Sequence, residues 1–247
     1  MIHVKSEKEI ELMREPCKIV RDTLNFVGSK ISAGMSTKEV DELVERYIRA
    51  SGAYPSCLGY GGFPASACIS VNEVVVHGIP GERILREGDI VSVDLCAYKN
   101  GYHGDACRTF RIGKVADEVD KLVQVTEECF FKGIEGLRAG TPLFDIGYKV
   151  QKHAEAHGYG VIRSYTAHGI GKEMHEDPNV PNYGKMGTGM RLRAGTVICV
   201  EPMIALGDWR VKLLKDGWSA VTVDGKPASH YENTLVVRED GVEILTL

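Results

Sequence analysis

The sequence predicts a single α+β domain over residues 1–247, in which helices cover a mostly antiparallel sheet and two halves are related by pseudo-symmetry. One reason is an internal repeat. "REGDIVSVDL" resembles "RAGTVICVEP", and their acids, Asp94 and Glu201, are 107 residues apart. Upstream, "ISAGMSTKEV" resembles "LRAGTPLFDI", with 106 residues between Gly34 and Gly140. A second reason is that helical patterns precede strand patterns in each half. We place the halves at about 1–110 and 111–247 and expect a site where they meet.

Two helices are expected in each half. An apolar stripe with spacings of three and four residues indicates the first; it consists of Ile10, Met13, Cys17, Val20, Leu24, Val27 and Ile31. Ser36 and Glu39 fit a capping box that would start the second helix. In the second half, residues 119–137 have a helical pattern. Thr141 and Pro142 are expected to supply the N-cap and the first residue of the next helix.

A hairpin is predicted around Asn100 and Gly101, which lie between two strand-like runs. A two-residue turn there would pair Cys96 with Asp105 and place Asp94 on the same face. The two aspartates would then be diagonal neighbours, with Cα atoms roughly 7–8 Å apart. Two carboxylates in an apolar sheet repel each other and are poorly solvated. The pattern therefore predicts a positive partner between them, which is an arginine, a lysine or a metal ion.

The composition argues against several classes of protein. A net charge of −4 argues against broad nucleic-acid binding. "MIHVKSEKEIELM" has no apolar signal core, and no run is long enough to span a membrane. Seven cysteines are scattered without a CxxC pair, which is typical of reduced thiols in a cytosolic protein. We expect a cytoplasmic monomer that binds neither nucleic acid nor membrane.

Further acids and histidines lie at the ends of predicted strands. Glu201 follows an apolar strand, and Glu232 lies in the strand pattern "SHYENTLVV". Three histidines have glycine nearby or end a strand, namely His77, His168 and His175. The others are expected to be non-catalytic; they are His3, His103, His153, His157 and His230. His153 and His157 are four residues apart on a predicted helix, but no HExxH pattern accompanies them, so they are weak metal candidates.

Charge counting favours metal ions at the predicted site. Four carboxylates carry a charge of −4, which two divalent ions would balance while still permitting a bound hydroxide. An oxygen-rich set of ligands with one imidazole is typical of sites for Mn, Fe(II), Co or Zn and differs from a thiolate zinc site. Two ions about 3.5–4 Å apart form a hydrolytic centre. The residues alone thus predict a dinuclear metallohydrolase.

The chain resembles the type I methionine aminopeptidases, in their short bacterial form. The segments that carry the resemblance are "GYGGFPASACISVNEVVVHGIP", "GDIVSVDLCAYKNGYHGDACRTF", "AHGIGKEMHEDPNVPNYG", "ICVEPM" and "HYENTLVV". It implies the pita-bread fold and removal of the initiator methionine from nascent polypeptides when the second residue is small. The implied metal ligands are Asp94, Asp105, His168, Glu201 and Glu232. A hydroxide bridging the two metals would attack the peptide.

The resemblance also implies roles for other side chains. His77 and His175 would bind the substrate and its oxyanion without holding metal, and Glu201 would relay a proton. The methionine pocket would be lined by Cys57, Tyr60, Cys68 and Trp218, with Phe63 at the rim. Met174 stands where the family usually has phenylalanine, and Phe63 stands where tyrosine is common.

Two other interpretations are possible. Prolidase and creatinase relatives share this fold, but they usually carry an additional N-terminal domain. Some pita-bread proteins have lost their metals and bind ribosomal or histone partners, yet no ligand position is missing here. The expected partners are the N-termini of nascent polypeptides, met close to the ribosome.

Overall fold

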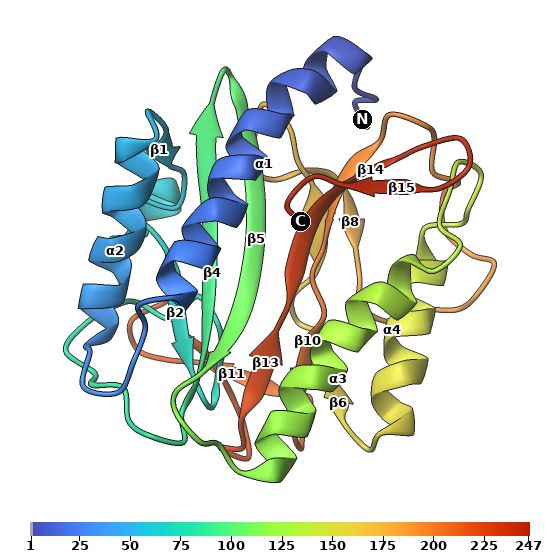
Figure 1. The fold of residues 1–247 in the computed structure, drawn as a ribbon. Coiled ribbons are helices and arrows are strands. Elements are labelled where there is room, and N and C mark those ends of the chain that lie inside the picture. Colours follow the sequence, from blue (N-terminus) through green and yellow to red (C-terminus); the bar gives the residue numbers. More distant parts are fainter. Residues whose placement is uncertain (1) are drawn as a thin grey trace.

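The computed structural model describes residues 2–247, in which helices pack on one face of a curved sheet (Figure 1). The helices are α1 (Glu7–Gly28), α2 (Thr37–Ala50), α3 (Asp117–Ile134) and α4 (Phe144–Ala156), with a 3-10 turn η1 (Tyr60–Gly62). The strands of the first half are β1 (Tyr54–Pro55), β2 (Cys68–Val71), β3 (Val74–Val76), β4 (Ile90–Lys99) and β5 (Tyr102–Arg111). Those of the second half are β6 (Gly160–Val161), β7 (Ala167–Gly169), β8 (Glu176–Val180), β9 (Val197–Val200), β10 (Met203–Ala205), β11 (Val211–Leu213), β12 (Ala220–Thr222), β13 (Ala228–His230), β14 (Glu232–Val237) and β15 (Val242–Ile244).

The first two helices begin at the residues that the sequence indicates. Ser6 and Glu9 form a capping box at the start of α1, and Ser36 and Glu39 form the one predicted for α2. The predicted apolar stripe of α1 is buried from Ile10 to Val27, whereas Ile31 lies beyond the end of the helix and is half-buried. Each fully buried aliphatic side chain stabilises the fold by about 1.5–3 kcal/mol. The stripe thus holds α1 against β4 and β5.

The main sheet runs in the order β1-β4-β5-β14-β9-β7-β8, with β2 also paired to β4 and β15 to β14. The register of the β4–β5 hairpin is the predicted one, since Lys99 pairs with Tyr102 and Cys96 pairs with Asp105. Asn100 and Gly101 have φ values of 57° and 84°, as a type I′ turn requires. Strand β14, from the second half, lies between β5 and β9 and joins the halves into one sheet.

The two halves repeat the same backbone contacts. The Gly34 amide donates to the Leu85 carbonyl at 2.9 Å, and the Gly140 amide donates to the Leu192 carbonyl at 2.8 Å. Both glycines have positive φ, 93° and 87°, which other residues rarely adopt. Each half therefore holds the turn before its second helix by the same pair of segments, as the predicted pseudo-symmetry requires.

The start of α4 differs from the prediction. The helix begins at Phe144, and its N-cap is Leu143, which makes no side-chain capping bond. The Thr141 hydroxyl instead accepts a hydrogen bond from the Arg138 amide at 3.1 Å, and Pro142 forms a β-bridge with Arg191. Pairing with the segment around Arg191 keeps Thr141 and Pro142 outside the helix. The predicted N-cap at Thr141 is therefore wrong.

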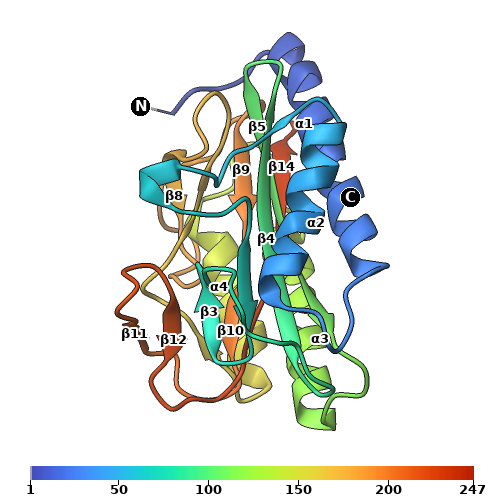
Figure 2. The same cartoon turned by 90° about the vertical axis from the view of Figure 1, so that its left-hand side faces the viewer.

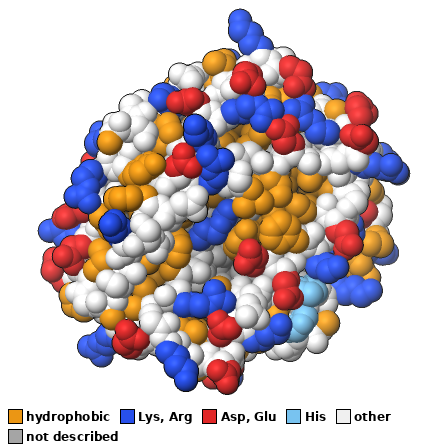
Figure 3. All heavy atoms as spheres, viewed as in Figure 1, with side chains coloured by type: hydrophobic (Ala, Val, Ile, Leu, Met, Phe, Trp, Pro, Cys, Tyr) orange, Lys and Arg blue, Asp and Glu red, His pale blue; other side chains and the backbone are white. Residues whose placement is uncertain are grey.

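The helices cover one face of the main sheet, and the opposite face is available for a site. Helices α1, α2 and α3 lie on one side, and the small sheet containing β11 and β12 lies on the other (Figure 2). On the helix side, charged side chains are scattered over the surface, and hydrophobic side chains form a patch near the middle of the view (Figure 3). Within residues 2–247, none of the helices has both the length and the apolar character needed to cross a bilayer.

Candidate metal centre

Three neighbouring strands bring acidic side chains to one face of the main sheet. Cys107 on β5 pairs with Asp94 on one side and with Glu232 on the other. Paired residues point to the same face, and so does Asp105, two residues from Cys107. Glu201 follows directly after β9, whose Val200 pairs with Asn233. The four carboxylates of the prediction therefore converge from β4, β5, β14 and the end of β9.

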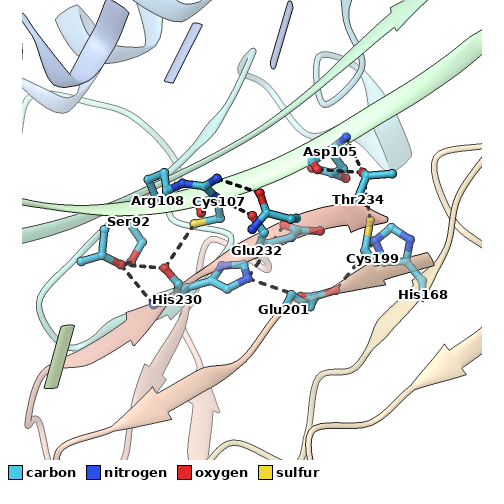
Figure 4. Close-up of polar contacts among 12 residues, drawn as sticks. Ser92, Asp105, Cys107, Arg108, His168, Cys199, Glu201, His230, Glu232 and Thr234 are labelled. Atoms are coloured by element: carbon cyan, nitrogen blue, oxygen red, sulfur yellow. Dashed lines mark hydrogen bonds and ion pairs between the residues drawn. The ribbon is translucent and has the colours of Figure 1, made fainter. Parts of the chain in front are cut away.

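Two imidazoles border this carboxylate cluster (Figure 4). The Nε2 atom of His168 lies 3.8 Å from Oε1 of Glu201. The Nδ1 atom of His168 donates to the Gly169 carbonyl at 2.9 Å, which leaves the Nε2 lone pair directed at the cluster. The Nε2 atom of His230 lies 3.5 Å from Oε2 of Glu201 and 3.9 Å from Oε2 of Glu232.

The carboxylates strongly perturb one another. Burial, followed by the charge of Asp94, raises the pKa of Asp105 well above its ordinary value. Burial and the charge of Asp105 do the same to the pKa of Glu232. Burial raises the pKa of Asp94 to about 6. Burial also opposes ionisation of Glu201, but the nearby His230 and His168 outweigh it and lower its pKa. The neighbouring side chains therefore do not supply enough positive charge to balance four ionised carboxylates.

Several polar atoms of the cluster fit a cation. Among the described residues, the buried Oδ1 of Asp105, Oε1 of Glu232 and Nε2 of His230 have no hydrogen-bond partner. Ligand atoms of Asp105, His168 and Glu232 lie within 4.8 Å of one another, together with the Cys199 sulfur. Burial raises the pKa of the Cys199 thiol well above its ordinary value, so it remains protonated and is a poor ligand. The remaining donors are oxygen-rich with imidazole, a set that suits divalent metal ions.

A cavity of about 470 Å³ opens onto the cluster. Its lining includes the five predicted ligands Asp94, Asp105, His168, Glu201 and Glu232, and all eight other predicted site residues: Cys57, Tyr60, Phe63, Cys68, His77, Met174, His175 and Trp218. These side chains come from both halves of the chain. The structure thus places every predicted site residue around one space.

Two histidines stand on the cavity wall apart from the carboxylates. The Nδ1 atom of His175 lies 2.6 Å from the Tyr60 hydroxyl, and its ring meets that of His168 edge-on at 4.3 Å. Burial and His168 lower the pKa of His175 to about 4, and burial lowers that of His77. Both rings are therefore neutral at pH 7. His77 has a φ of 58°, a conformation that is uncommon outside glycine and is found at functional sites.

The expected position of Phe63 is not the one observed. Its side chain is only 4% exposed, because its ring packs edge-on against Trp218 at 5.2 Å. Tyr60, at 44% exposure, occupies the more open position instead. Met174 is 6% exposed and packs among apolar side chains that include Ile10 and Met13 of α1.

Sequence reasoning missed several residues of the site. His230 was expected to lie outside it, yet its side chain is buried against Glu201 and Glu232. The signal was present, because His230 precedes Glu232 by two residues and alternate residues in an extended chain share a face. Tyr165 and Asn179 also line the cavity. Tyr165 stands just before the segment "AHGIGKEMHEDPNVPNYG", and Asn179 lies within it, but the resemblance gave neither residue a role.

Comparisons with known proteins agree with this geometry. The sequence pattern of metallopeptidase family M24 matches residues 11–239. The methionine aminopeptidase of Clostridium acetobutylicum is 52% identical, over 100% of this chain and 99% of that protein. Methionine aminopeptidase 1 of Bacillus subtilis is 45% identical, over 100% and 99%. The predicted resemblance to methionine aminopeptidases is confirmed.

Solved structures give the same result. The crystal structure of methionine aminopeptidase from Rickettsia prowazekii superimposes with a TM-score of 0.98 at 42% identity, covering 100% of both chains. Prolidase from Pyrococcus furiosus has a TM-score of 0.80 at 22% identity over 99% of this chain and 65% of that one, a likeness of fold alone. The pita-bread fold predicted from the sequence is therefore confirmed. With a family pattern over most of its length and full-length relatives near 50% identity, the chain belongs to metallopeptidase family M24.

Proposed function

We propose that this protein is a methionine aminopeptidase that removes the initiator methionine from nascent polypeptides when the second residue is small. The observation that carries the proposal is that two groups of side chains line the same cavity. A carboxylate and imidazole cluster that fits metal ions lies beside sulfur-containing and aromatic side chains that suit a thioether. The similarity to named methionine aminopeptidases over the full chain supports the same activity.

The metal ligands in this proposal are Asp94, Asp105, His168, Glu201 and Glu232. Two divalent ions, drawn from Mn, Fe(II), Co and Zn, would balance the four carboxylates. Among residues 2–247, the buried Oδ1 of Asp105 and Oε1 of Glu232 have no hydrogen-bond partner, so each would be free to bind a metal ion. When bound, the metal ions supply Lewis acidity toward a carbonyl oxygen and make water a nucleophile near neutral pH.

The protein's own side chains position the substrate and move protons. His77 and His175 are neutral, so their ring N–H groups can donate to the oxyanion without bringing a full positive charge to the metals. Such a donor is worth about 10²- to 10³-fold in kcat. The neighbours of Glu201 keep its carboxylate ionised, and in this proposal it would accept a proton and pass it on.

The lining of the cavity supports selection for methionine. Cys57, Cys68 and Met174 offer polarizable sulfur, and the Phe63 and Trp218 rings close the same space. A free α-amine at the carboxylate cluster would distinguish an N-terminal residue from an internal or acetylated one. We propose that the partners are nascent N-termini near the ribosome and that the protein acts as a cytoplasmic monomer, without nucleic-acid or membrane contact.

Peptide cleavage with controlled metal content tests the proposal. Chelation should abolish cleavage of Met-Ala-Ser, and Mn, Fe(II) or Co should restore it. Met-Gly peptides should be cut, Met-Lys and Met-Phe peptides should be poor substrates, and N-acetylated Met-Ala-Ser should be inert. A preference for residues that precede proline would favour the prolidase alternative. Full activity after complete chelation would reject the metal mechanism, and peptide binding without cleavage would indicate a binding module.

A further inference from the structure

A second group of metal-binding side chains lies outside the cavity, between helices α3 and α4. Glu128 of α3, His153 of α4 and His157, the residue that caps the end of α4, each offer one ligand atom, and these atoms lie within 4.8 Å of one another. Glu128 and His153 are half-buried, and His157 is exposed. Figure 3 shows histidine side chains at the surface of the face that carries α3 and α4, with acidic side chains beside them. A dissolved ion could therefore reach the group.

The geometry within this group is close to that of a metal site. The Nε2 atom of His153 lies 2.9 Å from Oε2 of Glu128. Two ligand atoms on a tetrahedral ion with bonds of 2.0–2.1 Å are separated by about 3.3 Å, so a shift of a few tenths of an ångström would admit the ion. The rings of His153 and His157 are 4.7 Å apart, as expected for side chains four residues apart on one helix face.

The His157 ring is already oriented as a ligand. Its Nδ1 donates to the backbone carbonyl of His153 at 2.9 Å, which fixes the proton on Nδ1 and leaves the Nε2 lone pair available. Metal-binding histidines commonly donate their second ring nitrogen to a carbonyl in this way. The position at the C-terminal end of α4 also favours a cation, because the helix dipole is negative there. Helix capping alone accounts for the His157 bond, but it does not account for Glu128, which comes from a different helix.

We propose that Glu128, His153 and His157 form a peripheral site for a borderline divalent cation such as Zn²⁺, separate from the catalytic cavity. Two imidazoles and one carboxylate select such ions over Mg²⁺ and Ca²⁺, which prefer oxygen ligands. Three protein ligands leave the fourth position to water. The ion would displace Lys121, whose Nζ lies 3.9 Å from Oε1 of Glu128, and would tie α3 to α4. This inference is independent of the proposed peptidase activity.

The test compares zinc binding in four forms of the full-length protein: wild type, the double variant His153→Ala/His157→Ala, Glu128→Gln and His3→Ala. Each is loaded with Co(II) to restore cleavage of Met-Ala-Ser, and bound Zn²⁺ is then measured by equilibrium dialysis. The wild type should retain one more equivalent of Zn²⁺ than the double variant. Glu128→Gln should lower the affinity for that additional Zn²⁺ by at least about tenfold. Excess Mg²⁺ should not compete for it.

His3→Ala is the matched control. His3 also hydrogen-bonds a glutamate, Glu9, at 2.9 Å, but that pair belongs to no three-residue group of metal ligands among the described residues. This variant should bind as much Zn²⁺ as the wild type. All four forms should cleave the peptide at equal rates, which shows that they are folded. Equal Zn²⁺ stoichiometry and affinity in the wild type and the double variant would overturn the proposal, and so would loss of the extra equivalent in Mg²⁺.

Discussion

The Nε2 atom of His230 lies 3.5 Å from Oε2 of Glu201, at the buried edge of the carboxylate cluster. The His230 side chain has almost no exposed surface and its Nε2 has no hydrogen-bond partner among residues 2–247. Its proximity helps to lower the pKa of Glu201 and so to keep that carboxylate ionised. We predict that His230→Ala lowers metal affinity by about 10- to 100-fold, the usual effect of losing a group that supports a ligand. Isothermal titration with Mn²⁺ would measure this, and unchanged affinity would show that His230 only fills space.

Asp105→Asn should affect the metal-free and metal-loaded proteins in opposite directions. Removing one of several buried like charges reduces repulsion, so the metal-free variant should melt at a higher temperature than metal-free wild type. The variant should lose the further stabilisation that Mn²⁺ gives the wild type, because ligand binding stabilises only the form that binds. Thermal melts with and without Mn²⁺ test both signs. Asp240→Asn, at an exposed position, should change neither.

His77→Ala separates positioning from metal binding. The variant should keep its metal content and its melting temperature while kcat falls by about 10²- to 10³-fold, because an oxyanion donor is lost. Metal analysis and peptide kinetics on the same sample are the measurement. An empty metal site in this variant would make His77 a ligand and would contradict its proposed role as an oxyanion donor.

Met174→Phe should change the shape of the pocket and leave its chemistry intact. Met174 lines the cavity and is packed on its other side, so a rigid ring there must displace either the core or the substrate. We expect norleucine and leucine to be discriminated more strongly against methionine, by at most about 10- to 200-fold in relative kcat/KM. Rates on Met-, Nle- and Leu-Ala-Ser peptides measure it. Identical ratios in both forms would place Met174 outside the substrate's reach.

Asp41, on α2, predicts a pH dependence of stability that arises from a group outside the metal cluster. Its Oδ1 accepts hydrogen bonds from the amides of Ser66 and Ala67, and burial raises its pKa from 3.8 to about 6. The folded state therefore holds the proton more tightly than the unfolded state does. Protonation of Asp41 therefore stabilises the folded state fully below about pH 4, and this stabilisation is lost as the pH rises through about 6.

Asp41→Asn removes this proton equilibrium. Between pH 4 and 7 the free energy of unfolding of the wild type should fall relative to that of the variant. We expect a fall of about 1–2 kcal/mol, less than the full shift implies because the side chain is partly exposed. Urea denaturation of both proteins at several pH values gives the difference, from which other titrating groups cancel. Parallel pH profiles would contradict the prediction.

Local signals explain what the sequence predicted well. The Asn100-Gly101 turn and the capping box at Ser36 are set by residues within a few positions of each other, so their geometry follows from residue type. Thr141 had an equally good local signal for a helix cap, but pairing of Pro142 with the distant Arg191 overrode it. The spacing of His230 and Glu232 indicated a shared face, but it did not show that Glu201, from another strand, lies beside His230.

The central position of β14 determines when the metal centre can exist. Glu232 follows Asp105 by 127 residues in the sequence, and its strand lies between β5 and β9. During synthesis, Asp94 and Asp105 must wait for a strand that emerges more than a hundred residues later. Such long-range pairing is slow to form. If Glu232 is a ligand as proposed, metal loading would follow synthesis of β14. A chain truncated before β14 would lack Glu232, while Asp94 and Asp105 would still repel each other.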